Sequence, residues 1–279
     1  MDDHHTENDL RRISSDLSPI DTYRESMMDI ISVLQNLEPE QWALATPCPG
    51  WSIADIAAHL IDLDSMAMGA PKVEHEPDWN SLPHVTSPSH QFTERGVDYR
   101  RGTPPAELLY QLMANIHALT NYIANNSVAI KVPWAKEELS TELFLTMRAF
   151  DVWVHELDIR AAISQPGNFG SNAARSSAQR MFSSLPLIWG KRAGAPIGSS
   201  LQLSITGADI SGVTNIVVGP DGKAVVVDSL TSPDNTVTLP WPDFADAYAG
   251  RVPVEMTKSR ANMEGELAES FISSLASTP

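Results

Sequence analysis

The chain has 279 residues, of which 42% are hydrophobic, and a formal net charge of -16 at pH 7. Its length exceeds that of one average domain, so we expect two. The negative charge repels phosphate backbones and anionic lipids, and no basic patch offsets it, which argues against nucleic-acid and membrane partners. The single cysteine, Cys48, excludes an internal disulfide and fits a reducing compartment. The sequence has no signal-peptide pattern and predicts a cytoplasmic protein.

Residues 1–17 are polar and acidic, and we expect a disordered tail there. The adjacent His4 and His5 are interpreted as part of this tail rather than as a pair of metal ligands. From Pro19 to Leu37 apolar residues recur at helical spacing, which predicts a first amphipathic helix.

A second helix is predicted within TPCPGWSIADIAAHLIDLDSMAMG, residues 46–69, where two prolines and a glycine precede Ser52. Ser52 can cap this helix, with Asp55 at the third helical position. His59 lies at the edge of the apolar stripe, so it could face the interior of a bundle. The commoner role of such a histidine is that of a core residue hydrogen-bonded to Asp55 or to a carbonyl group. Cys48, just before the helix, is typical of a small buried hydrophobic residue.

Residues 70–90 contain four prolines and three histidines without periodicity, which predicts a long loop. We interpret His75, His84 and His90 as loop residues. A short helix is expected over 92–101, and another begins at the two prolines 104 and 105.

Asp151 and His155 lie four residues apart in TMRAFDVWVHELDIRAA, residues 146–162, within a helix that Ser140 can cap. They should share one face beside a buried apolar stripe, where a carboxylate needs a partner. Their spacing is that of half a metal site, although side-chain hydrogen bonds and solvated faces show it too. His59, on another predicted helix, is a further candidate ligand. Asp158 either orients a ligand or is an ordinary surface carboxylate.

The sequence therefore predicts an α+β protein of two domains. The first, over residues 18–192, is an up-and-down bundle of four long helices with an insertion, extended by a helix over 172–188. The second, over 193–279, has short β-rich runs at 201–207, 214–220, 223–229 and 235–240, followed by helices at 241–249 and 262–275. No P-loop, glycine-rich dinucleotide turn or G-x-S-x-G motif occurs.

Several segments together resemble the mycothiol-dependent maleylpyruvate isomerase family, whose helical domain belongs to the DinB-like metal-binding bundles. They are TPCPGWSIADIAAHL, LPHV, RRGTPPAELL, VPWAKEEL, RAFDVWVHELDIRAA and LIWGKRAGAP. The resemblance implies that His59, Asp151 and His155 bind one divalent ion, with zinc favoured, and that mycothiol is a co-substrate. Asp151 stands where the family pattern has Glu, so it could reach the metal directly, reach it through water, or favour another ion. Arg251 matches a catalytic arginine of the C-terminal domain.

Two histidines and one carboxylate leave an open position on a tetrahedral ion, and a thiol there would ionise. Our hypothesis is a thiolate that attacks a small electrophilic substrate, in an isomerase or a thiol transferase. A metal-dependent hydrolase that uses bound water, or a non-catalytic protein that binds a small molecule, are the alternatives. The sequence defines neither the substrate nor the oligomeric state.

Overall fold

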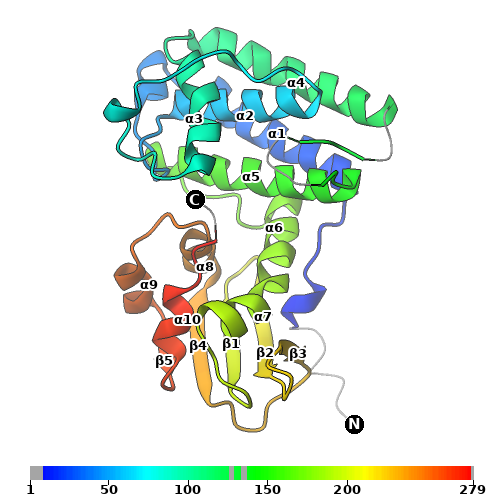
Figure 1. The fold of residues 1–279 in the computed structure, drawn as a ribbon, viewed down its shortest axis with the longest axis vertical. Helices are drawn as coiled ribbons and strands as arrows, with labels where there is room; N and C mark the ends of the chain where they lie inside the picture. Colours follow the sequence, from blue (N-terminus) through cyan, green and yellow to red (C-terminus); the bar gives the residue numbers. More distant parts are fainter. Residues whose placement is uncertain (1–8, 126–128, 133–136, 278–279) are drawn as a thin grey trace. The chain divides into compact units, whose positions relative to one another are not determined.

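The computed structural model describes residues 9–125, 129–132 and 137–277, which form two compact units (Figure 1). The helical unit comprises residues 16–168. The sheet unit combines the described residues up to Ser15 with those from Phe169 onward. Among all these residues, no helix has both the length and the apolar character needed to cross a membrane.

The helical unit is the predicted bundle of long helices with one shorter helix inserted. Its helices are α1 (Pro19–Gln35), α2 (Ile53–Ala67), α3 (Pro88–Arg100), α4 (Pro105–Asn125) and α5 (Thr141–Ala162), with 3-10 turns at Pro39–Ala43 and Trp79–Ser81. Helix α5 packs along α1, and α2 packs against both α3 and α4. Each fully buried Leu or Ile of this core contributes about 1.5–3 kcal/mol before chain entropy is counted.

Serine caps fix where helices α2 and α5 begin. The Oγ of Ser52 accepts a hydrogen bond from the backbone N–H of Asp55 at 3.2 Å, and the Asp55 carboxylate accepts one from the backbone N–H of Ser52 at 2.9 Å. The Oγ of Ser140 accepts from the N–H of Leu143 at 3.1 Å. Such caps stabilise a helix start by about 1 kcal/mol. Both predicted caps are confirmed, and they set which residues of α2 and α5 face inward.

The sheet unit contains a mixed five-stranded sheet with the strand order β3-β2-β1-β4-β5. Strands β1 and β4 are parallel, and the other neighbouring pairs are antiparallel. The strands are β1 (Ser200–Thr206), β2 (Gly212–Val218), β3 (Ala224–Val227), β4 (Asn235–Pro240) and β5 (Asn262–Glu264). The helices of this unit are α6 (Asn172–Ser183), α7 (Leu185–Leu187), a π-helical turn (Ile188–Arg192), α8 (Trp241–Tyr248), α9 (Val254–Arg260) and α10 (Ala268–Ser273). The first four strands and α8 agree with the sequence prediction.

The helix predicted over residues 172–188 is shorter than expected and belongs to the sheet unit rather than to the bundle. Helix α6 ends at Ser183, because Pro186 lies in the first turn of the next helix and cannot continue a preceding one. The residues from Phe169 onward cluster with the sheet unit, whereas the sequence analysis assigned residues up to 192 to the bundle. Helix α6 packs against α7 and the 3-10 turn Leu10–Arg12, which explains this grouping.

The two ends of the chain also differ from the predictions. Residues 262–264 were expected to be helical, but they pair with the edge of β4, and α10 begins only after Gly265. Gly265 has φ +97°, and a Cβ there would meet the carbonyl oxygen of Asp234, so a regular helix cannot pass through this position. Of the predicted tail, residues 1–8 with His4 and His5 lie outside the described residues. Leu10, by contrast, is fully buried in a 3-10 turn, and Asp9 bridges to Val213.

Candidate metal centre

Helices α2 and α5 bring His59, Asp151 and His155 together in the helical unit. The Nε2 atom of His59 lies 3.4 Å from Oδ2 of Asp151, and Nε2 of His155 lies 3.6 Å from Oδ1 of the same carboxylate. One potential donor atom of each residue lies within 4.8 Å of those of the other two. The structure thus juxtaposes the three residues that the family resemblance singled out.

The arrangement leaves a buried nitrogen atom without a hydrogen bond. Both histidines are only 5% exposed, and Nε2 of His59 has no partner of acceptable hydrogen-bond geometry among the described residues. Leaving a buried polar atom unsatisfied costs about 1–3 kcal/mol, which a bound cation would offset. Two imidazole nitrogens and a carboxylate oxygen are the donor set of many zinc sites and suit other divalent transition metals. The residues present therefore fit a divalent ion.

The Asp151 carboxylate lies close to the imidazole rings of both His59 and His155, although the aspartate side chain is short. One of its oxygens faces His59 and the other faces His155. Its side chain keeps 30% of its surface exposed, whereas the two imidazoles are nearly covered. The carboxylate is therefore the part of the group that a ligand could approach from solvent.

Arg148 is a buried partner of Asp151 that the sequence analysis missed. Its side chain is 3% exposed, pairs closely with Oδ2 of Asp151, and donates from Nε to Oδ1 of Asp64 at 2.9 Å. The hydroxyl group of Tyr23 donates to the other oxygen of Asp64 at 2.8 Å. The i,i+3 spacing of Arg148 and Asp151 could have indicated this pair. The contacts with Tyr23 on α1 and Asp64 on α2 could not be predicted from the sequence of α5.

These charges decide the protonation states at the site. Burial works against the ionised form of Asp151, but the interactions with His59 and Arg148 outweigh it and lower the pKa of Asp151. Because an arginine stays protonated at physiological pH, Arg148 keeps the carboxylate ionised whatever the state of His59. Burial lowers the pKa of His59 and outweighs the attraction of Asp151. A neutral imidazole and an ionised carboxylate are the forms that bind metal ions.

Asp158 is the hydrogen-bond partner of His155. Its Oδ2 atom lies 3.0 Å from Nδ1 of His155, and Asp158 is 2% exposed. A proton held on Nδ1 leaves the lone pair of the histidine on Nε2, the atom that faces Asp151. Of the two interpretations made from the sequence, the structure excludes the surface carboxylate and supports the orienting partner.

Cys48 lies close to His155 and Asp158. It is buried, and its sulfur belongs to a second cluster with His155 and Asp158 in which the potential ligand atoms lie within 4.8 Å of one another. Nothing in the spacing of Cys48 predicted this proximity, because it depends on the approach of α5 to the turn before α2.

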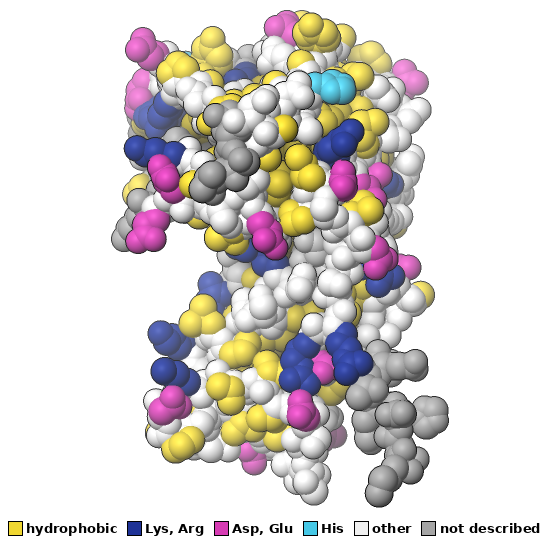
Figure 2. All heavy atoms as spheres, turned by 90° about the vertical axis from the view of Figure 1, so that its right-hand side faces the viewer, with side chains coloured by type: hydrophobic (Ala, Val, Ile, Leu, Met, Phe, Trp, Pro, Cys, Tyr) yellow, Lys and Arg dark blue, Asp and Glu magenta, His cyan; other side chains and the backbone are white. Residues whose placement is uncertain are grey.

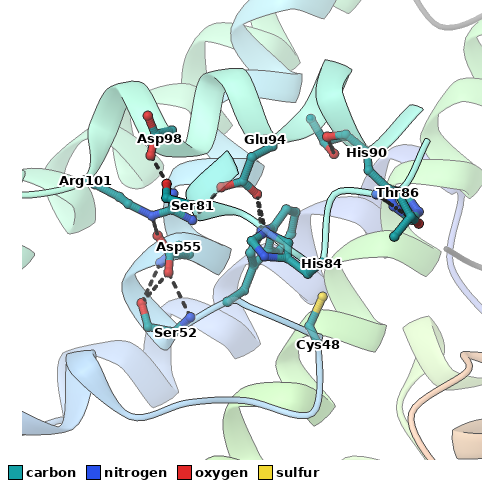
Figure 3. Close-up of polar contacts among 12 residues, drawn as sticks. Cys48, Ser52, Asp55, Ser81, His84, Thr86, His90, Glu94, Asp98 and Arg101 are labelled. Atoms are coloured by element: carbon teal, nitrogen blue, oxygen red, sulfur yellow. Dashed lines mark hydrogen bonds and ion pairs between the residues drawn. The ribbon is translucent and has the colours of Figure 1, made fainter. Parts of the chain in front are cut away.

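The other histidines of the predicted loop have partners of their own. His84 bonds to Glu94 at 3.0 Å, as Figure 3 shows, and His75 bonds to Asp98 at 2.7 Å. His90, which we interpreted as a loop residue, lies instead in the first turn of α3, 3.2 Å from the hydroxyl group of Thr86. Among the described residues, these histidines belong to no cluster that could hold a metal ion.

Arg251 lies in the sheet unit, in the turn after α8. Its backbone N–H donates to the carbonyl oxygen of Asp246 at 2.9 Å, and its guanidinium group donates to that of Ala249 at 2.9 Å. Its catalytic role stays a prediction.

A pocket of about 540 Å³ lies between α1 and α4, and the metal-centre residues do not line it. Exposed hydrophobic side chains gather on the face of the helical unit drawn in Figure 2. The pocket lining includes Met28, Ile31, Met113 and Ile116. The pocket is therefore separate from the candidate metal centre.

Taken together, the fold and the site define an α+β protein whose helical unit carries a His-Asp-His group able to hold a divalent cation. Residues 23–160 match the family model of the mycothiol maleylpyruvate isomerase N-terminal domain. The helical unit therefore carries the N-terminal domain of the mycothiol maleylpyruvate isomerase family, as the motifs predict.

Two curated proteins are similar in sequence to about half of the chain. The chain is 26% identical over 136 residues to uncharacterized proteins from two strains of Mycobacterium tuberculosis. The match covers 48% of this chain and 52% of each relative, so the chain spans about half the length of these relatives.

Two crystal structures share the fold. One is of the mycothiol-dependent maleylpyruvate isomerase, with 16% identity and a TM-score of 0.52, and the other is of a histidine-to-alanine mutant of that enzyme, with 15% identity and a TM-score of 0.54. Both matches cover 89% of this chain and 92% of the other. At this level of identity they establish the α+β architecture alone.

Proposed function

We propose that this protein is a metal-dependent and mycothiol-dependent enzyme, an isomerase or thiol transferase that acts on a small electrophilic substrate. The observation that carries the proposal is the His59-Asp151-His155 group with its unsatisfied His59 nitrogen, found in a helical unit that carries the N-terminal domain of this family. Zinc is the ion that we favour, because two imidazoles and one carboxylate form a common open zinc site.

The charges around the site support the presence of a cation. Arg148 is flanked by the carboxylates of Asp64 and Asp151, and Asp158 is a further buried acid next to His155. One arginine cannot neutralise both Asp64 and Asp151, and buried charge without compensation is costly. A divalent cation held by His59, Asp151 and His155 would balance the cluster.

The residues of the chain have distinct tasks in this proposal. Arg148 keeps Asp151 ionised and fixes its carboxylate, while Asp158 orients His155 so that Nε2 is available as a ligand. When bound, the ion would favour the thiolate form of an incoming thiol, which is the nucleophilic form. Arg251, by resemblance to the family, would assist from the sheet unit.

The first test is the metal content per chain, measured by mass spectrometry on protein purified without an affinity tag. We expect about one ion per chain in the wild type, as for a single open site, and loss of that ion in His59→Ala. His75→Ala is the matched control, because His75 lies in the same unit but belongs to neither cluster. Equal metal content in wild type and His59→Ala, or no metal in either, would overturn the proposed site.

The second test separates the reaction classes. Small electrophiles, maleylpyruvate among them, are incubated with metal-loaded protein with and without mycothiol. We expect turnover only with the thiol, with products isomerised or carrying the thiol. Turnover without any thiol would identify a hydrolase that uses water instead, and metal binding without turnover of any tested electrophile would favour a binding protein.

A further inference from the structure

The two histidines of the candidate centre are oriented by different means. His155 has a buried hydrogen-bond partner in Asp158, 3.0 Å from its Nδ1 atom. Nε2 of His59 faces the Asp151 carboxylate at 3.4 Å but has no partner of acceptable hydrogen-bond geometry among the described residues. Histidines that bind metals are usually oriented through their second ring nitrogen. Among the described residues, packing of neighbouring side chains is therefore the contact that can hold the His59 ring.

Trp51 is the residue that packs on both rings. Its indole centroid lies 4.9 Å from that of His59 and 5.8 Å from that of His155, and the residue is 8% exposed. These separations are those of favourable contacts between aromatic rings. Trp51 immediately precedes the Ser52 cap, so the start of α2 positions the indole next to its own second turn.

Glu94 of α3 holds this indole in place. The Nε1 atom of Trp51 donates to Oε2 of Glu94 at 2.8 Å, and Glu94 is 1% exposed. Figure 3 shows Glu94 between His84 and Arg101, which lie 3.0 Å and 2.5 Å from its carboxylate oxygens. A buried carboxylate fixed by several partners forms a strong, directional anchor.

The turn before α2 leaves room for this anchor. Gly50 has φ +78°, and a Cβ at this position would overlap the imidazole of His84. A glycine in the PGW sequence therefore lets His84 lie against the turn and bond to Glu94 on its other side. The loop and α3 are thus connected to the candidate centre through one indole ring.

We propose that Trp51 and Glu94 are positioning residues for the metal centre: Glu94, through the hydrogen bond to Trp51, holds the indole against His59 and so fixes the imidazole for metal binding. This inference rests on the proposed function, because it concerns residues assigned there as ligands. It adds α3, which supplies no ligand, to the elements that determine metal affinity.

The test uses Co²⁺ as a spectroscopic probe of the full-length protein. Trp51→Phe keeps an aromatic ring but removes the donor to Glu94, and we expect Co²⁺ to bind about tenfold more weakly, with a changed visible absorption spectrum. Trp42→Phe is the control, because Trp42 is also buried, at 5% exposure, in the core of the same unit. It should leave affinity and spectrum unchanged.

Substitutions at Glu94 test the same connection from its other end. Glu94→Gln keeps an acceptor oxygen for Trp51 and should retain most of the affinity, whereas Glu94→Ala should lose about tenfold. Trp51 and Glu94 act through one hydrogen bond. The double variant of Trp51→Phe and Glu94→Ala should therefore bind Co²⁺ no more weakly than whichever single variant binds it more weakly. Additive losses would contradict the proposed connection.

The outcomes separate this inference from the proposed function. If the wild type binds no Co²⁺, both fail. If the wild type binds Co²⁺ and Trp51→Phe matches Trp42→Phe in affinity and spectrum, the metal centre stands and the positioning role is overturned. Should Glu94→Ala prove unfolded by circular dichroism, Trp51→Phe alone decides the matter, because it removes only the donor and part of one ring.

Discussion

The helical unit and the sheet unit bury polar groups of different kinds. The buried polar residues described in the sheet unit are uncharged, namely Ser176, Ser177, Ser200, Thr214, Asn215, Asn235 and Thr257. The helical unit buries ionisable side chains as well, and these are Asp55, His59, Asp62, Asp64, Glu94, Arg148, His155, Glu156 and Asp158. Both units have large apolar cores, so the difference does not reflect a lack of hydrophobic residues in the bundle.

This difference is informative because buried charge is costly. An ion pair inside a protein often contributes less stability than apolar residues of the same volume, so stability alone does not explain such a concentration. Several of these groups surround the facing surfaces of α2 and α5, where they orient one another. We interpret the buried polar groups of the sheet unit as stabilising its fold. We interpret the buried charged groups of the bundle as maintaining the candidate metal centre.

The largest effect is expected for Arg148→Met. The variant leaves the buried carboxylate of Asp64 and the carboxylate of Asp151 without their arginine, and removal of one partner of a buried pair costs about 3–5 kcal/mol. Urea unfolding followed by circular dichroism measures this loss. A variant as stable as the wild type would show that the buried charges are not coupled. It would contradict the conclusion that the two units bury polar groups for different reasons.

His155→Ala should have a smaller effect on stability and a large one on metal content. Asp158 loses its hydrogen bond to His155, at a cost of about 1–3 kcal/mol, while the apolar stripes still hold the bundle. We therefore expect helical circular dichroism to remain nearly intact and metal content to fall sharply. Loss of the fold would show instead that His155 is a core residue.

Asn235→Ala tests the sheet unit in the same way. The Asn235 amide group donates to the carbonyl oxygen of Ser200 at 3.1 Å and accepts from the N–H of Leu267 at 2.8 Å. Losing both bonds should cost about 1–2 kcal/mol. The number of metal ions per chain should not change, and a change would mean that the sheet unit also determines the site.

The smallest effect is expected for Arg24→Met, which removes the same kind of side chain as Arg148→Met from the surface of the same unit. Arg24 is 54% exposed and lies 3.7 Å from Asp21, an exposed acid. Its loss should change the free energy of unfolding by less than about 0.5 kcal/mol. If both arginine variants were equally destabilised, overall charge rather than burial would be the cause.

Local sequence predicted most of the secondary structure. Ser52 and Ser140 mark the starts of α2 and α5, and the β-rich runs after residue 200 form the first four strands. The failures involve tertiary context: residues 262–264 become a strand only because the edge of β4 is available to pair with them. Leu10 is ordered because the sheet unit provides a place to bury it.

For the candidate centre, the sequence by itself determined that Asp151 and His155 share a face of one helix, because helical spacing is a local property. Family motifs added His59. The spacing within α5 also allows Asp158 to reach His155. Only the tertiary structure decided that Asp158 is buried, that Arg148 meets Asp64, and that Trp51 joins Glu94 to both imidazoles. These contacts link residues on α2, α3 and α5, and the distance between two helices depends on the packing of the whole core rather than on the spacing of residues within either one.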